Sequence, residues 1–266
     1  MNLAKTQKFT ETIAHEAGQL LLKHFGKSKI TVQKGCNDFA TNADIASEKL
    51  IIKAIKKQFP DHAILAEESG VSTPGVAATP GVAQYTWVID PLDGTRNFQA
   101  KLPIWCVSIA LLKDGEPIIG VIYCPVLHEM HSARLGGGAK LNGRKLAVSE
   151  VNKLKDTTVI AGIPGLCYGP NHDKAARKMS KILKNVFRVR SFGAAAYEIM
   201  MVARGFADAY IDLSGTTKLW DVAAAMVIVR EAGGVIYDHT EKHMPKHYKA
   251  ICASNAKLTG KIQKII

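Results

Sequence analysis

Apolar side chains recur at a helical spacing in two stretches near the start of the chain. The first spans residues 6–25, and Gly26 is placed to end it. The second runs from about residue 44 to residue 59 and stops at Pro60-Asp61. The pattern therefore predicts two amphipathic helices that bury one face each.

Short apolar runs bounded by turn residues then predict strands. "AILAEES" reads as a short strand that ends in acidic residues, and "QYTWVID" follows as another. "IWCVSIALL" and "PIIGVIYCP" flank Lys113-Asp114-Gly115-Glu116, which predicts an antiparallel hairpin, and Asn142-Gly143 predicts a second one. Between the first two strands, "TPGVA" occurs at 73–77 and again at 79–83, which is typical of a surface loop.

The second half of the chain alternates between strand and helix patterns. Strands are expected near 157–163, 187–191, 206–213, 234–238 and 249–253, and helices near 173–186, 194–204 and 219–232, with a further helix at the end. We therefore predict a layered α+β and α/β fold in a single domain spanning 1–266, with an N-terminal α+β half (about 1–150) and a C-terminal α/β half (about 151–266).

The composition indicates the cellular compartment and the kinds of partner that the protein can have. The five cysteines are scattered and include no C-x-x-C pair, which favours reduced thiols in the cytoplasm over a disulfide frame or a zinc site. No apolar run approaches the length that spans a bilayer. The formal net charge is +12, which lysine-rich solvent-facing surfaces explain and which an affinity for nucleic acid or phosphorylated metabolites would also explain.

Two carboxylates, Asp90 and Asp93, directly follow the apolar run at 85–89. Buried together without a partner they would repel each other, and a hard divalent cation is the partner that takes several oxygen ligands. Gly94-Thr95 then opens a predicted helix, whose first amides can bind phosphate. The alternative is that both aspartates only cap turns. Residues 90–98 alone favour neither the metal site nor the caps.

Other acidic residues favour the metal interpretation. Glu67 and Glu68 end a predicted strand, while Asp44 and Asp221 each begin a predicted helix. Strand ends and helix starts gather at one edge of layered sheets, where active sites of such folds lie. Two further motifs carry less weight: "LGGGAKLNGRKL" lacks the spacing of known phosphate loops and favours a hairpin, and "HEMH" at 128–131 favours a surface bend over a metal site.

The chain resembles the inositol monophosphatase family of Mg²⁺-dependent, lithium-sensitive phosphatases. The resemblance covers nearly the whole chain and rests on "KGCNDFATNADIASE" (34–48), "AEES" (66–69), "DPLDGTRNF" (90–98), "RSFGAAA" (190–196), "FADAY" (206–210) and "WDVAAAMVIVREAGG" (220–234). It implies a five-layer αβαβα sandwich of the sugar-phosphatase type and a homodimer.

The resemblance also implies roles for individual residues. Two or three Mg²⁺ ions would be bound by Glu67, Asp90, the carbonyl of Leu92, Asp93 and Asp221. Asp44 and Thr95, with Glu67, would serve catalysis by orienting the attacking water. Substrate contacts would come from Lys34, Asp93, Gly94, Thr95, Gly193, Ala194, Ala195, Asp212 and Asp221. Glu68 is expected to support the site without binding metal.

Two departures concern the substrate. Ala194 stands where the family often has threonine, and Asp212 stands in place of a glutamate that often binds ring hydroxyls, in a slightly longer segment. We therefore predict a phosphomonoesterase for inositol monophosphate or a similar small polyol or sugar phosphate. The alternatives are histidinol phosphate or fructose 1,6-bisphosphate as substrate, or a nucleic-acid or transcription-complex binding protein.

Overall fold

The computed structural model describes residues 1–35, 38–70, 84–163, 171–238 and 251–266. Its first two helices are α1 (Leu3–His24) and α2 (Asn42–Gln58), in agreement with the apolar spacing. Asn2 caps the start of α1, since its side chain accepts a hydrogen bond from the Lys5 amide at 3.1 Å. The duplicated "TPGVA" segment lies outside the described residues.

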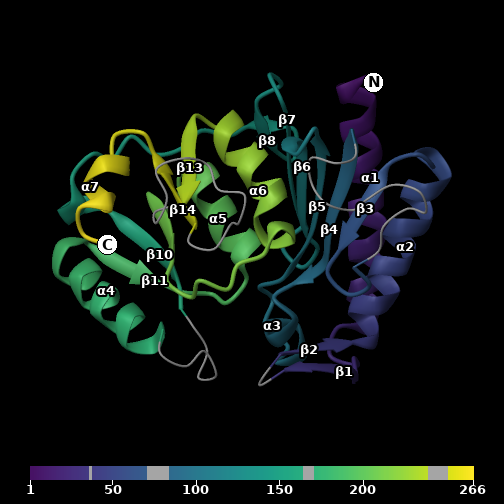
Figure 1. Cartoon of the computed structure of the whole chain (residues 1–266), viewed down its shortest axis with the longest axis horizontal. Coiled ribbons are helices and arrows are strands. Elements are labelled where there is room, and N and C mark those ends of the chain that lie inside the picture. The colour runs from purple at the N-terminus through teal and green to yellow at the C-terminus, as the bar shows by residue number, and fades with distance from the viewer. Residues whose placement is uncertain (36–37, 71–83, 164–170, 239–250) are drawn as a thin grey trace.

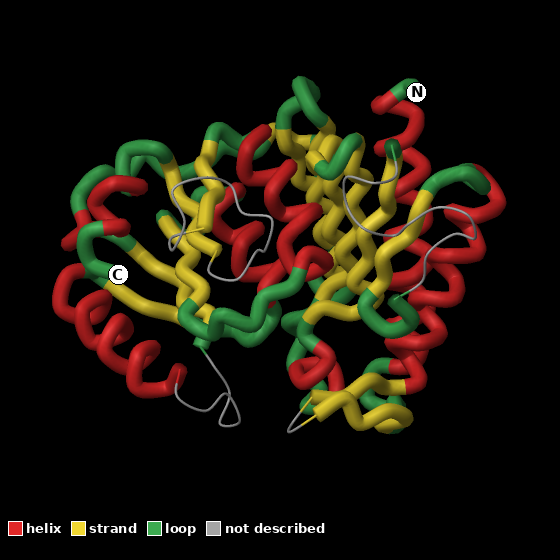
Figure 2. Tube along the Cα trace, in the orientation of Figure 1, coloured by secondary structure: helices red, strands yellow, loops and turns green. Residues whose placement is uncertain are grey.

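The helices and sheets stack in five alternating layers (Figures 1 and 2). The outer layer of α1 and α2 covers one face of a seven-stranded sheet, and α5 (Ala195–Ala203) and α6 (Leu219–Glu231) cover the other. A five-stranded sheet packs on the far side of α5, and α4 (Asn171–Asn185) and α7 (Thr259–Gln263) complete the stack. The predicted five-layer αβαβα sandwich is confirmed.

The seven-stranded sheet is antiparallel except where its first two strands pair in parallel. Its strands follow chain order: β3 (Ala63–Ala66), β4 (Tyr85–Asp93), β5 (Cys106–Lys113), β6 (Glu116–Cys124), β7 (Glu129–Arg134), β8 (Ala139–Leu141) and β9 (Arg144–Lys145). Both predicted hairpins are present. Their turns place Asp114, Gly115, Asn142 and Gly143 at positive φ, the geometry that Asp-Gly and Asn-Gly favour.

The five-stranded sheet is mixed. Its order is β11 (Arg188–Arg190), β10 (Thr158–Gly162), β12 (Ala209–Asp212), β14 (Ile251–Asn255) and β13 (Gly234–Asp238). The large sheet ends at Lys145 and the small one begins at Thr158, on either side of the predicted division near residue 150. That division into halves remains a prediction.

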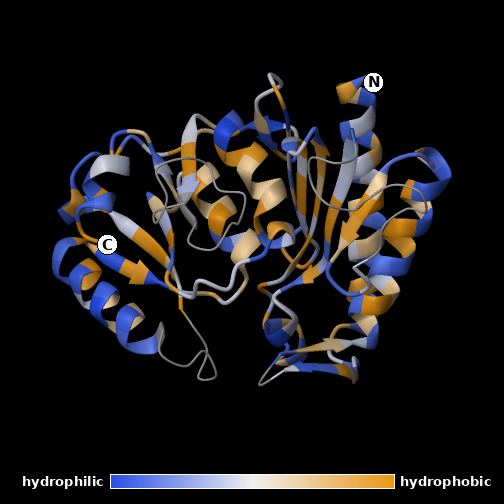
Figure 3. Cartoon of the chain, in the orientation of Figure 1, coloured by the Kyte–Doolittle hydropathy of each residue, from blue (hydrophilic) through white to orange (hydrophobic). Residues whose placement is uncertain are grey.

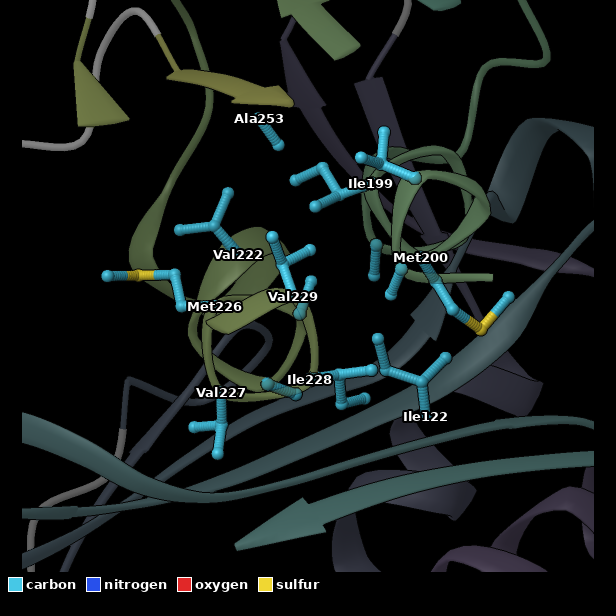
Figure 4. Close-up of a cluster of buried hydrophobic side chains, with 14 of the residues drawn as sticks. Ile122, Ile199, Met200, Val222, Met226, Val227, Ile228, Val229 and Ala253 are labelled. Carbon is cyan, nitrogen blue, oxygen red and sulfur yellow. The ribbon is translucent and has the colours of Figure 1, made fainter. Parts of the chain in front are cut away.

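The largest core cluster lies where α5 and α6 fill the space between the two sheets, and the hydropathy colouring is apolar there (Figure 3). Figure 4 shows Ile228 of α6 beside Ile122 of β6, while Val222 and Val229 face Ile199 and Ala253. At Gly120 of β6 an added Cβ would come within 2.1 Å of the Ala224 carbonyl oxygen, so glycine allows α6 to contact the sheet.

Two local patterns have features beyond their sequence interpretation. "HEMH" does include a turn, with His128 at positive φ, but it then enters β7 and buries His131 completely. The glycine-rich turn before β8 binds an anion from within the protein, because the Gly136 and Gly138 amides donate to the Glu231 carboxylate at 2.8 and 2.7 Å.

A two-stranded antiparallel ribbon that the apolar pattern did not predict, β1 (Ile30–Gly35) and β2 (Asp38–Thr41), precedes α2. All six residues of β1 are exposed, so the strand lacks the alternation of apolar and polar positions that would have indicated it. None of the helices among the described residues is both long enough and apolar enough to cross a membrane.

Candidate active site

The end of β4 brings Asp90 and Asp93 to the same edge of the large sheet. The pairing of β4 with β5 shifts register between these two residues, so Pro91 and Leu92 form a bulge and the chain turns. The Leu92 amide donates to Asp90 Oδ1 at 2.9 Å, and Ser47 of α2 holds the turn by donating to the Pro91 carbonyl at 3.0 Å. Both aspartates are buried in a rigid setting.

Asp44 and Thr95 form the pair that the sequence predicted. The Thr95 hydroxyl lies 2.9 Å from Asp44 Oδ1 and 3.0 Å from the Leu92 carbonyl oxygen. The other oxygen of Asp44 accepts hydrogen bonds from the Thr41 amide at 2.9 Å and the Thr41 hydroxyl at 2.5 Å, in the capping box of α2. The Asp44 carboxylate is therefore fixed from the side opposite Thr95.

Glu67 and Glu68 follow β3 and share one cation. The Lys34 ammonium, from β1, lies 2.8 Å from Oε1 of each glutamate. The Glu68 amide donates to Glu48 Oε2 at 2.8 Å, which holds the segment against α2. The exposed ribbon thus places a positive charge directly on the acidic residues.

Asp221 occupies the first turn of α6. Its Oδ2 accepts a hydrogen bond from the Lys218 amide at 2.6 Å, which completes a cap at the start of the helix. Asp221 faces Asp93 and Glu67 closely enough that their charges act on its pKa. Residues from three separate elements, β3, β4 and α6, therefore converge at this edge.

The pKa values of these carboxyl groups are raised. Burial, followed by the negative charges of Glu67 and Asp93, holds the pKa of Asp90 well above its usual range. Burial also raises the pKa of Asp93 to about 6, although the amide of Tyr197 opposes the rise. Burial also raises the pKa of Glu67 and the pKa of Asp221, although the charge of Lys34 opposes the rise at Glu67. Deprotonated, the group would carry several negative charges that repel one another.

This donor set fits divalent cations. Mg²⁺ prefers carboxylate oxygens as ligands; Asp90 and Asp93 are buried here, and the Lys34 ammonium already occupies a cationic position on Glu67. Within the described ranges no three acidic, histidine or cysteine side chains already stand in coordination geometry. An ion that binds Glu67 Oε1 would therefore compete with the Lys34 ammonium.

The predicted substrate-contact residues include Gly94 before α3 and residues 193–195 at the start of α5. Gly94 has φ +87° and begins α3 (Thr95–Gln99), where an added Cβ would lie 2.9 Å from the Ile104 carbonyl oxygen. Gly193 is exposed and Ala195 half-buried, but Ala194 is buried against Gly94, 3.1 Å from that same added Cβ. Gly94 and Ala194 thus pack the two halves of the site closely together.

Asp212 is engaged within its own loop. Its Oδ1 accepts hydrogen bonds from the Ser214 amide at 2.7 Å, the Ser214 hydroxyl at 2.6 Å and the Gly215 amide at 3.4 Å, and its Oδ2 accepts one from Thr217 at 2.5 Å. The side chain is buried, and both oxygens hold the loop before α6. Direct contact between Asp212 and a substrate remains a prediction.

The sequence analysis did not single out Glu198 and Asn97. Glu198, in α5, is 2% exposed, and its Oε1 accepts hydrogen bonds from the Phe192 and Gly193 amides. Asn97 Nδ2 donates to the Phe192 and Ile104 carbonyl oxygens at 2.7 and 2.8 Å. A charged residue inside the apolar stretch "AAAYEIMMVA" was the available signal for Glu198.

Comparisons with known proteins agree with this geometry. The family described as the inositol monophosphatase family matches residues 2–266. "Nus factor SuhB" of Xylella fastidiosa is 36% identical over 265 residues, covering 95% of this chain and 91% of that protein. "Fructose-1,6-bisphosphatase/inositol-1-monophosphatase" of Aquifex aeolicus is 37% identical, covering 88% and 86%. The solved structure of extragenic suppressor protein suhB from Bartonella henselae is 32% identical with a TM-score of 0.89, covering 98% of each chain.

Proposed function

Since this chain belongs to the inositol monophosphatase family, we propose that it is a Mg²⁺-dependent phosphomonoesterase acting on inositol monophosphate or a similar small polyol or sugar phosphate. The observation that carries this proposal is the convergence of Glu67, Asp90, Asp93 and Asp221 beside the hydrogen-bonded Asp44–Thr95 pair. Gathering four carboxyl groups at one edge, with Lys34 contacting only Glu67 of the four, is costly unless bound cations balance them.

The residues would divide the work as follows. Glu67, Asp90, Asp93, Asp221 and the carbonyl of Leu92 would hold the ions. Bound Mg²⁺ supplies a water of lowered pKa and neutralises charge on the phosphate and the leaving oxygen. The Thr95 hydroxyl donates to Asp44 at 2.9 Å, so its oxygen would accept a hydrogen bond from the attacking water and orient it.

Binding of the phosphate falls to neighbouring groups. The amides of Gly94 and Thr95 would donate to its oxygens. Once an ion displaces Lys34 from Glu67, the Lys34 ammonium would bind the phosphate instead. Gly193, Ala194 and Ala195 would form the wall beside the leaving group, with Asp212 near it.

The names of two relatives bear on the substrate. The Aquifex aeolicus protein is named as both a fructose-1,6-bisphosphatase and an inositol-1-monophosphatase, and an "Inositol monophosphatase" of Dictyostelium discoideum is 33% identical over 263 residues. Phosphate release from inositol 1-phosphate, fructose 1,6-bisphosphate and histidinol phosphate, with Mg²⁺ and with or without lithium, tests the proposal. Mg²⁺-dependent release that lithium inhibits is expected, and no release from any of the three would contradict it.

A second candidate function, binding of RNA in a transcription complex, has a separate basis. Helix α4 exposes Lys174, Arg177, Lys181 and Lys184 against a single acid, Asp173, and the exposed Arg188 and Arg190 of β11 lie next to it. Several relatives are named "Nus factor SuhB". The net charge of +12 is consistent with attraction to a polyanion.

Salt-dependent RNA binding tests this candidate. Affinity for a single-stranded RNA should fall steeply between 50 and 200 mM salt. The slope of log affinity against log salt concentration should be about −0.7 for each phosphate contacted. The variant Lys181→Glu/Lys184→Glu should weaken binding and reduce that slope without changing phosphatase activity. Absence of binding at low salt would remove the candidate and leave the phosphatase proposal intact.

A further inference from the structure

Asp93 is held by groups from the other half of the molecule. The Ala195 amide donates to Asp93 Oδ1 at 3.0 Å, and the Tyr197 amide donates to Asp93 Oδ2 at 3.1 Å. These amides belong to the first turn of α5, which has no side-chain cap of its own. Asp93 therefore serves as the cap of α5, and α5 fixes the direction of the Asp93 carboxylate.

The first turn of α5 is itself held by Glu198. Glu198 Oε1 reaches back past the helix start and accepts hydrogen bonds from the Phe192 amide at 2.5 Å and the Gly193 amide at 3.0 Å. Gly193 adopts φ +74°, so the turn is tight, and Asn97 holds its other side through the Phe192 carbonyl oxygen. The position of the turn thus depends on two side chains that touch no candidate ligand atom.

These contacts form one continuous chain of hydrogen bonds. It runs from Glu198 to the turn at 192–193, along the backbone to the Ala195 and Tyr197 amides, and from these to Asp93. Every side chain in it that accepts a hydrogen bond is buried, Glu198 at 2% and Asp93 at 7% exposure, so water cannot replace a lost partner cheaply.

From this chain we propose that Glu198 is a positioning residue that sets the Mg²⁺ affinity of the site by fixing Asp93. The inference rests on the proposed function, because it takes Asp93 to be a metal ligand. Glu198 acts through its acceptor oxygen rather than through its charge. Burial raises the pKa of Glu198 to about 7, against the effect of the two amides, so a neutral side chain with the same oxygen should do the same work.

Two substitutions of Glu198 distinguish the effect of its acceptor oxygen from the effect of its side-chain volume. Glu198→Gln keeps an oxygen where both amides can reach it, whereas Glu198→Leu keeps a similar volume and removes the acceptor. The matched control is Asp208→Leu. Asp208 is also buried and in the same half, and accepts hydrogen bonds from the Thr158 amide and the Ser149 hydroxyl, which are not part of the chain that ends at Asp93.

A substitution at Ala195 tests the last link without touching Glu198. Ala195 is the first residue of α5, where proline is well tolerated, and Ala194 before it is extended (φ −147°, ψ 100°), as a residue preceding proline must be. Ala195→Pro replaces the N–H that donates to Asp93 Oδ1 with a ring carbon, which also displaces that oxygen, and it leaves the helix intact. It therefore keeps the proposal testable if Glu198→Leu does not fold.

The experiment is calorimetric titration of Mg²⁺ into the full-length protein without substrate. We expect Mg²⁺ affinity to fall about 10- to 100-fold in Glu198→Leu and Ala195→Pro, the range for residues that orient a metal ligand. Glu198→Gln should stay within about threefold of wild type, and Asp208→Leu should be unchanged even where its unfolding midpoint drops. In Glu198→Leu, phosphate release should recover toward the wild-type kcat at high Mg²⁺.

The outcomes separate the two proposals. If the wild-type protein binds Mg²⁺ and Glu198→Leu binds it equally well, the positioning role is overturned while the phosphatase proposal stands. The same holds if Asp208→Leu loses as much affinity as Glu198→Leu, since the effect would then be general loosening. A wild-type protein that binds no Mg²⁺ overturns the proposed function and this inference together.

Discussion

Asp212 is buried and Asp221, only nine positions further along the chain, is partly buried, yet their surroundings differ completely. Asp212 accepts hydrogen bonds on both oxygens from Ser214, Gly215 and Thr217 of its own loop. Asp221 accepts one from the Lys218 amide and otherwise faces other carboxyl groups, which with burial hold its pKa well above the usual range. Burial of a charge alone does not indicate function. A buried charge without enough donors does, because only a bound cation or a proton can balance it.

The largest effect is expected from removing the charge of Asp221. Asp221→Asn keeps an oxygen for the Lys218 amide and removes the charge of a proposed metal ligand, so Mg²⁺-dependent phosphate release should fall by at least about 10³-fold, about 4 kcal/mol of transition-state stabilisation. Asp212→Asn is the matched variant and should retain most of the rate. Wild-type turnover by Asp221→Asn would show that the unpaired carboxylate is not catalytic.

The pH dependence of stability offers a second test, in the metal-free protein. Burial raises the pKa of Asp93 from its ordinary value of 3.8 to about 6. Between these values the folded state keeps a proton that the unfolded state has lost. The contribution of Asp93 to stability therefore falls as the pH rises through this window, by about 3 kcal/mol at most.

Urea unfolding in EDTA at several pH values measures this effect. The stability of Asp93→Asn relative to wild type should increase from pH 4 to pH 7, and Mg²⁺ added to the wild-type protein at pH 7 should close the gap. A gap independent of pH would mean that Asp93 is as well compensated in the fold as Asp212 is.

A structural feature can be predicted from the sequence when the residues that form it are neighbours in the chain. The hairpin turns at Asp114-Gly115 and Asn142-Gly143 were predictable because their geometry depends on adjacent residues alone. The pairing of Asp44 with Thr95 and the expected role of Glu67 came from a family resemblance, since no local pattern brings α2, α3 and the segment after β3 together.

The rest required the fold. The sequence shows that Asp212 and Asp221 both lie near the start of an apolar helix, and it predicted a substrate contact for Asp212. Only the loop geometry shows the four donors around Asp212. Glu198 was visible as a charge in an apolar helix, but its targets at 192–193 depend on how the turn before α5 folds back.

A smaller effect is expected from Asp212, and it falls on stability. Asp212→Ala removes the acceptor of four hydrogen bonds and should lower the free energy of unfolding by about 2 kcal/mol, since the donors that face the loop surface can bind water instead. Comparing KM for inositol 1-phosphate and for p-nitrophenyl phosphate, which lacks ring hydroxyls, tests the predicted substrate contact. An increase for inositol 1-phosphate alone would support that contact, whereas equal KM changes would restrict Asp212 to holding the loop.

The smallest effect concerns a carboxylate at the opposite end of α6 from Asp221, which is hydrogen-bonded on both oxygens as Asp212 is. Glu231 accepts the Gly136 and Gly138 amides, one on each oxygen, so Glu231→Gln loses one acceptor and should cost about 1 kcal/mol in urea unfolding. Glu231 is also the last residue of α6, where a negative charge faces the negative end of the helix dipole, and its removal offsets a few tenths of that loss. Mg²⁺ affinity and phosphate release should not change. If either fell with Glu231→Gln, the contrast between Asp212 and Asp221 would no longer mark the site, because a carboxylate outside the acidic group would then also control it.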